Sequence, residues 1–278
     1  MVEKEDLEEL IMKKRIISAI LILAVFIPFL LIGGLPFTIF MSIIGMLGLY
    51  ELIHIRESRK EFPLITKFFA FILFAVLMFI SYGNFDFQFS LDLRFISLMI
   101  FLFLLPMVFI NNTKKYNLND ALFQTGCVLF LGISFNLLIL IRDSSLEIII
   151  YLLLIQTLTD TFALITGRLV GSHKLCPTIS PKKTIEGAIG GSLVATFVSV
   201  AFYMTVCSTS ANIWFVILVT LLLSIVGQLG DLVFSSIKRY YDKKDFSDLI
   251  PGHGGILDRF DSLIFISLAF VFIIEYMM

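Results

Sequence analysis

Long apolar stretches alternate with short polar ones along this chain, a pattern typical of a protein that crosses a membrane several times. A helix that spans a bilayer needs about 20 mostly apolar residues. Nine stretches approach that length, at 16–33, 36–54, 64–81, 93–110, 119–141, 146–166, 187–206, 211–234 and 261–277. The pattern therefore predicts an all-α polytopic membrane protein with about nine transmembrane helices, and a tight turn at 142–145.

The composition supports a membrane protein over a water-soluble one. Hydrophobic residues make up 58% of the chain and charged residues only 15%, whereas a soluble domain carries about 25% charged residues. Three cysteines, Cys127, Cys176 and Cys207, are too few for a disulfide framework. We expect all three to be free thiols.

The distribution of lysine and arginine predicts the orientation. With nine spans and the N-terminus in the cytoplasm, every basic residue except Arg94 and Arg142 falls on the cytoplasmic side. The C-terminus is then outside. Before the first span, the acidic residues 3–9 lead into a basic cluster, which predicts an amphipathic helix at the membrane surface.

Polar residues are distributed unevenly between the two halves of the chain. The first five spans hold few of them, and the last four, with two long cytoplasmic loops, hold nearly all. We expect a transmembrane scaffold half at 1–145 and a catalytic transmembrane half at 146–278.

The segment 235–261 places cations, carboxylates and a glycine-rich turn between two apolar stretches. Lipid excludes such a segment, so it lies at the membrane surface or lines a wet cavity. Just before it, Asp231 and Ser235 are four residues apart and share a helix face. Ser235 can hydrogen-bond that carboxylate or a phosphate, whereas a pair between Asp231 and Lys238 would make a simple interfacial anchor.

Within this segment, the turn at 251–255 contains three glycines and His253. Glycine lets the backbone approach a ligand closely and point N–H groups at an anion. Asp258 and Asp261 follow, three residues apart, and carboxylate oxygens are the ligands that Mg²⁺ prefers. The alternative is that both acids cap the following helix and offset its dipole.

The loop after the sixth stretch holds the third group of polar residues. Lys182 and Lys183 precede a glycine-bearing helix, which suits phosphate binding. The positive-inside rule explains the same lysines, and Ser180 or Thr184 fits an ordinary helix N-cap. Asp160, inside the sixth stretch, needs a partner such as Arg168 or a lysine of this loop. Glu51, in the second stretch, is a weaker candidate for the polar cavity, because a place at the interface explains it equally well.

These residues together carry a resemblance to the phosphatidate cytidylyltransferases, also called CDP-diacylglycerol synthases. The family signature is matched in register by Ser235, Lys238, Arg239, Lys244, Asp245, Pro251, His253, Gly254, Gly255, Asp258, Arg259 and Asp261. The run from Ser180 to Gly187 resembles a second block of the same family. One departure is Ser172, where many relatives have a basic residue.

The resemblance implies the reaction of CTP with phosphatidic acid to give CDP-diacylglycerol and pyrophosphate. It implies Mg²⁺ on Asp231, Asp258 and Asp261, with a monovalent cation, K⁺, beside it. The residues that would hold CTP and the lipid phosphate are Lys182, Lys183, Ser235, Lys238, Arg239, Arg259, His253, Gly254 and Gly255. Lys244 and Asp245 would order the loop.

The resemblance also implies a homodimer in a bacterial-type plasma membrane, with its active site facing the cytoplasm and no nucleic-acid partner. Three alternatives stay open. The first is the same chemistry on another lipid phosphate. The second is an ion-coupled transporter using Asp160, Asp231 and Asp258, although the charges crowd one membrane face instead of the midplane. The third is a CDP-alcohol phosphatidyltransferase, whose aspartate spacing the chain lacks.

Overall fold

The computed structural model describes residues 17–18, 20–79, 93–207, 211–250, 252 and 254–277. The amphipathic helix predicted at 3–9 lies outside the described residues, as do Pro251 and His253. The chain divides into two compact units, Met1–Asp143 with Asp245–Asp258, and Ser144–Lys244 with Arg259–Met278.

Within the described residues, helices occupy all nine stretches that the hydrophobic pattern predicted. They are a short apolar helix at Ile20–Ile32, then α2 (Gly34–Glu57), α3 (Leu64–Phe79), α4 (Leu93–Ile110), α5 (Leu118–Ser144), α6 (Leu146–Val170), α7 (Ile185–Val206), α8 (Ile213–Tyr240) and α9 (Leu257–Phe270) with α10 (Ile274–Met277). Six of these, α2 and α4 to α8, are long and apolar enough to cross a membrane. The all-α polytopic class is confirmed, whereas the count of nine spans stays a prediction.

The last predicted span differs from the structure. A single helix at 261–277 was expected, but α9 begins at Leu257 and ends at Phe270. The amide of Val271 still donates to a carbonyl four residues back, but those of Phe272 and Ile273 donate to carbonyls only three residues back, at 3.3 and 3.0 Å. This tighter turn interrupts the α-helical hydrogen bonds before the short α10.

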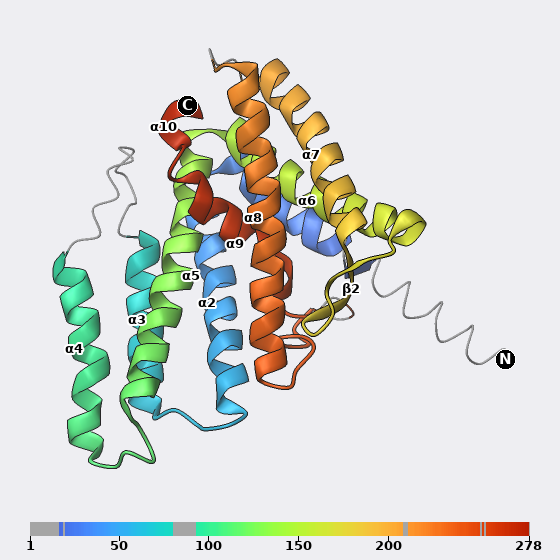
Figure 1. Ribbon diagram of the computed structural model, residues 1–278. Helices are drawn as coiled ribbons and strands as arrows, with labels where there is room; N and C mark the ends of the chain where they lie inside the picture. Colours follow the sequence, from blue (N-terminus) through green and yellow to red (C-terminus); the bar gives the residue numbers. More distant parts are fainter. Residues whose placement is uncertain are drawn as a thin grey trace. The chain divides into compact units, whose positions relative to one another are not determined.

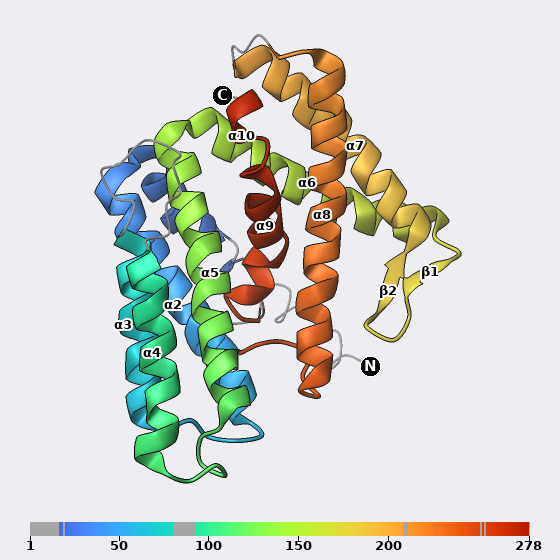
Figure 2. The same cartoon turned by 60° about the vertical axis from the view of Figure 1, so that its left-hand side comes forward.

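The first unit is built on α2, α3, α4 and α5 (Figure 2). Two polar contacts tie its helices together. Asp120 at the start of α5 is fully buried and pairs with Arg56 at the end of α2 at 3.0 Å, and with Lys60. Asn136 of α5 donates to the carbonyl of Leu77 at 2.9 Å, one of the carbonyls in the last turn of α3.

The turn predicted at 142–145 is shorter in the structure, because α5 continues to Ser144, and Arg142 near the end of this helix fastens the N-terminal helix of the unit. Arg142 donates to the carbonyl of Leu31 at 2.8 Å and to that of Leu30, and so caps the helix Ile20–Ile32. The chain then reverses at Gly33, whose φ of 68° is in the left-handed region. A Cβ there would lie 2.6 Å from the Arg142 guanidinium, so the position requires glycine.

The second unit packs α6, α7 and α8 against one another (Figure 1). It also holds the one departure from the all-α class in the described residues, a hairpin of β1 (Lys174–Cys176) and β2 (Ser180–Thr184). Thr184 is the N-cap of α7, accepting from the amide of Gly187 at 3.2 Å. The prediction of Thr184 as the cap is therefore confirmed and that of Ser180 is wrong, because Ser180 begins β2, four residues before the cap position of α7.

All three cysteines are free thiols, as the sequence predicted.

Candidate active site

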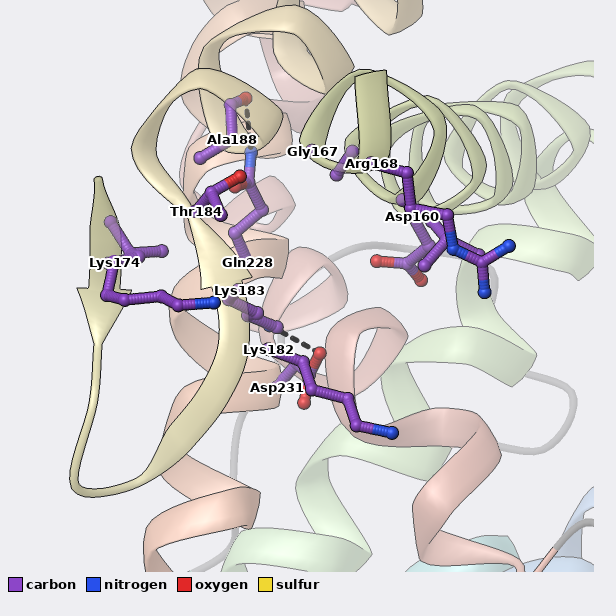
Figure 3. Close-up of a pocket in the computed structure, with 13 residues that line it drawn as sticks. Asp160, Gly167, Arg168, Lys174, Lys182, Lys183, Thr184, Ala188, Gln228 and Asp231 are labelled. Carbon is purple, nitrogen blue, oxygen red and sulfur yellow. Dashed lines mark hydrogen bonds and ion pairs between the residues drawn. The ribbon is translucent and has the colours of Figure 1, made fainter. Parts of the chain in front are cut away.

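A polar cavity of about 570 Å³ opens in the second unit (Figure 3). It is formed by α6, the β-hairpin, the start of α7 and α8. Its lining residues are Asp160, Ala163, Leu164, Gly167, Arg168, Lys174, Leu175, Lys182, Lys183, Thr184, Ala188, Gln228 and Asp231. Four cations and two carboxylates therefore meet in a unit whose helices are otherwise apolar.

Asp231 is the best-anchored acid of this cavity. Lys183 places its Nζ 2.5 Å from Asp231 Oδ2, and Ser235 donates to Oδ1 at 3.2 Å. The predicted bond between Ser235 and Asp231 is confirmed, and the partner seen for this acid is a lysine of the hairpin. The geometry exists because α8 continues to Tyr240, six residues beyond the predicted end of the apolar stretch, so both residues are helical.

Two further carboxylates, of Asp160 and Asp261, lie within electrostatic range of Asp231. Lys183 and Arg259 also lie within electrostatic range of Asp160, whereas the ion pair of Lys183 is with Asp231. Asp261 is only 8% exposed and feels the charge of Lys238, another buried cation. Acids and bases thus alternate through one site, as needed to hold both metal ions and phosphates.

The donor chemistry of these acids fits Mg²⁺. This hard cation prefers carboxylate oxygens and usually takes one or two of them, together with waters and substrate phosphate oxygens. Within the described residues, no group of three or more His, Cys, Asp or Glu side chains is gathered closely enough to form a complete cage. Asp231 and Asp261 offer a partial set of ligands of the kind that Mg²⁺ uses beside a nucleotide.

The predicted phosphate-binding cations fall in different places. Lys182 and Lys183 line the cavity from β2. Arg239, in contrast, donates to the carbonyls of Ile179 at 3.3 Å and Lys243 at 2.9 Å. Its guanidinium therefore ties the hairpin to the end of α8.

In the first unit, the segment 245–258 is folded around two carboxylates. Asp258 Oδ2 accepts from the amides of Phe246 at 3.0 Å and Gly255 at 2.9 Å. The N–H of Gly255, expected to face an anionic ligand, is therefore used by Asp258. Both donors lie before α9, so Asp258 closes the loop that precedes this helix and does not cap an amide of the helix itself.

Glu51 is the second of these carboxylates, and it is fully buried in α2. It accepts from Ser247 Oγ at 2.5 Å and from the amides of Ile256 at 2.8 Å and Leu257 at 2.9 Å. A Cβ at Gly255 would lie 2.5 Å from Glu51, so the glycine allows this close approach. Glu51 thus pins the loop before α9, a role that neither earlier interpretation foresaw.

The comparison with known proteins then decides the family. The model of the family described as "Cytidylyltransferase family" matches residues 13–277, nearly the whole chain. The chain belongs to the cytidylyltransferase family. A protein named phosphatidate cytidylyltransferase from Staphylococcus haemolyticus is 40% identical over 255 residues, which cover 92% of this chain and 96% of that protein. Proteins of the same name from Staphylococcus aureus and Staphylococcus epidermidis are 39% identical over the same lengths.

The cavity of this cytidylyltransferase also includes residues that the sequence-based site left out. Arg168, considered only as a partner of Asp160, lines the cavity together with Lys174 and Gln228. The signal for Arg168 and Lys174 was their place in the loop region of Lys182 and Lys183, and that for Gln228 was its position one helical turn before Asp231. Ser172, the departure from the family pattern, donates its amide to Glu186 at 3.1 Å, so its backbone holds the turn before the hairpin.

Replacing Glu51 should loosen the cytidylyltransferase loop without unfolding the protein. In Glu51→Gln the amide nitrogen cannot accept, so a buried donor of Ile256, Leu257 or Ser247 loses its partner, at a cost of about 1–3 kcal/mol. We expect amide hydrogen exchange in 246–257 to accelerate about tenfold or more. Glu61→Gln, an exposed change in the same unit, is the control. Unchanged exchange in Glu51→Gln would show that the loop does not depend on this carboxylate.

Proposed function

We propose that the protein is a phosphatidate cytidylyltransferase, which converts CTP and phosphatidic acid into CDP-diacylglycerol and pyrophosphate. The observation that carries the proposal is the ion-paired Lys183 and Asp231 in a cavity with three further cations, within a membrane unit. Membership of the family and the names of the relatives support the same reaction.

The chemistry is an in-line displacement at the α-phosphorus of CTP. An oxygen of the lipid phosphate forms a bond to this phosphorus while the bond to the β-phosphate bridging oxygen breaks, and pyrophosphate leaves. The attacking phosphate is already ionised, so no side chain has to remove a proton. The protein must bring two polyanions together and stabilise the charge of the transition state.

The side chains of the cavity suit these two tasks. The ammonium group of a lysine is a compact positive charge with three N–H donors. The planar guanidinium of an arginine can donate two parallel hydrogen bonds to two oxygens of a phosphate. Lys183 is already oriented by Asp231, so it loses little side-chain freedom when a phosphate arrives. Lys182 lines the cavity from the same strand as Lys183, Lys174 from β1 and Arg168 from α6.

The sequence-based metal assignment is part of the proposal. Asp231, Asp258 and Asp261 would hold Mg²⁺, with K⁺ as a second cation. Bound there, the cations would neutralise phosphate charge. The phosphate roles of Ser235, Lys238, Arg259, His253 and Gly254 are likewise proposed, and His253 lies outside the described residues.

An apolar groove of about 280 Å³ lies next to the cavity, between α7 and α8. It shares Leu175, Ala188 and Gln228 with the cavity wall. A polar cavity beside an apolar groove suits a substrate with a phosphate head and hydrocarbon tails. This arrangement favours a lipid phosphate over a soluble acceptor.

The topology is proposed on the charge distribution: nine spans in a bacterial-type plasma membrane, with the N-terminus and the active site facing the cytoplasm. A scaffold half at 1–145 and a catalytic half at 146–278 belong to the same proposal. The homodimer is proposed on the family resemblance alone.

The test of the reaction is product analysis with purified protein. Phosphatidic acid and an isoprenoid ether phosphatidate are offered in separate reactions with CTP and Mg²⁺, and the lipid product is identified by mass spectrometry. CDP-diacylglycerol formed at the higher kcat/KM supports the proposal. Exclusive use of the ether lipid would assign the same chemistry to another substrate.

Lys244→Ala should weaken the use of CTP more than it affects folding. Lys244 is exposed, so solvent screens its charge and we expect KM for CTP to rise a few-fold, with kcat nearly unchanged. Lys243→Ala, the same change at the neighbouring exposed lysine, is the control. An equal KM in the two variants would remove Lys244 from CTP binding.

A further inference from the structure

Gln228 presents an unused hydrogen-bond acceptor in the cavity. It lies on α8, one turn before Asp231, and lines the cavity wall. Its Nε2 donates to Ser192 Oγ at 2.7 Å and to the carbonyl of Ala188 at 3.3 Å (Figure 3 draws the latter bond). Both amide hydrogens are therefore engaged by α7.

The orientation of this amide is determined by its partners. The carbonyl of Ala188 can only accept, so the nitrogen of Gln228 must face it. Ser192 is held in turn by Ser224 Oγ at 2.9 Å, and Ser224 by Thr159 Oγ1 at 2.8 Å, both of them buried. Between membrane helices no water is at hand to replace these bonds, so the network resists rearrangement.

The remaining atom, Oε1 of Gln228, meets no donor in the part of the chain that the structure describes. Gln228 borders both the apolar groove and the polar cavity. The groove is lined almost entirely by apolar side chains, so a polar partner for this oxygen is to be expected only on the cavity side. Ala163, Leu164 and Leu175 line the same cavity, and apolar side chains such as these suit the faces of a planar ring.

We propose that Gln228 determines nucleotide specificity by accepting a hydrogen bond from the exocyclic amino group of cytosine. The inference rests on the proposed function, because it takes CTP as the substrate. Cytosine presents an N4 amino donor where uracil presents an O4 acceptor. Because α7 fixes the amide nitrogen, Gln228 can present only its oxygen to the base. With uracil, this Oε1 would face the O4 atom, and neither acceptor would have a donor.

The experiment compares kcat/KM for the four combinations of two proteins and two nucleotides. The wild-type protein and Gln228→Met are assayed with CTP and with the pyrimidin-2-one triphosphate, which lacks only the amino group. A lost hydrogen bond to a fixed acceptor costs at least about tenfold in kcat/KM. We expect the wild type to prefer CTP by at least about tenfold, and Gln228→Met to use both nucleotides within about threefold.

Ser224→Ala is the matched control, since it removes a bond of the same network but leaves the Gln228 amide on Ala188 and Ser192. Its preference for CTP should equal that of the wild type. If Gln228→Met does not fold, Gln228→Asn withdraws the oxygen by one methylene while keeping the amide, and the preference should fall again.

Three results would contradict the inference in distinguishable ways. If Gln228→Met still prefers CTP, the inference is wrong, but the proposed function is unaffected. A surviving preference together with an altered cation requirement would make Oε1 a metal ligand instead. A wild-type protein that transfers no cytidylyl group would overturn the proposed function, and with it the inference.

Discussion

Asp231→Asn should abolish cytidylyl transfer while the protein stays folded. The substitution removes the charge that pairs with Lys183 at 2.5 Å and that the proposed Mg²⁺ requires. Loss of an outer-shell partner of a metal costs 10–100-fold, so loss of a proposed ligand should lower kcat by about 10²-fold or more. The amide oxygen can still accept from Ser235, so the helix should keep its local hydrogen bond.

The control for this variant is Asp242→Asn, the same chemical change at the end of α8. Asp242 has a φ of 56° just beyond the helix, and asparagine also tolerates this left-handed conformation. We expect its activity and its thermal unfolding to match the wild type. If Asp231→Asn kept more than about a tenth of the wild-type rate, Asp231 could not be a metal ligand in the reaction.

Asp258→Asn should also abolish activity, but for two physical reasons. A neutral amide binds Mg²⁺ poorly, as the sequence-based assignment requires. In addition, Asp258 Oδ2 accepts from Phe246 and Gly255, and an amide nitrogen placed there would face two donors. The expected result is a loss of about 10²-fold in kcat together with faster hydrogen exchange in 246–257.

Adding excess Mg²⁺ separates the loss of a metal ligand from the loss of the loop hydrogen bonds. If Asp258 is a ligand, a higher Mg²⁺ concentration should partly restore activity in Asp258→Asn while exchange in the loop stays fast. Asp248→Asn, at an exposed acid of the same segment, should leave both unchanged. Wild-type kcat in Asp258→Asn would exclude Asp258 from the metal site.

The helices and several contacts of the site were predictable because they depend on local patterns. The length of each apolar stretch located the helices, and the four-residue spacing of Asp231 and Ser235 predicted their hydrogen bond. Thr184 was recognisable as a cap because a polar residue precedes the apolar run of α7. The family motifs led to the correct family because their order along the chain is long and specific.

The remaining features depend on contacts that no local pattern contains. Glu51 accepts a hydrogen bond from the amide of Ile256, 205 residues away, and no sequence pattern around Glu51 predicts this contact. The hairpin at 174–184 has strands of three and five residues, too short to show an alternating pattern. The helix α8 continues past its apolar stretch to Tyr240, because Lys238 and Arg239 are good helix formers that add to a helix already formed. The end of an apolar stretch therefore does not mark the end of the helix.

The most direct test of the proposed reaction follows the two ends of CTP separately. Purified protein is given phosphatidic acid, Mg²⁺ and CTP labelled with ³²P at either the α- or the γ-phosphate. Nucleotidyl transfer predicts α-label in the chloroform-soluble lipid and γ-label in aqueous pyrophosphate, with both absent in Asp231→Asn. Label from the γ-phosphate in the lipid, or no lipid label from either nucleotide, would contradict the proposed attack at the α-phosphorus.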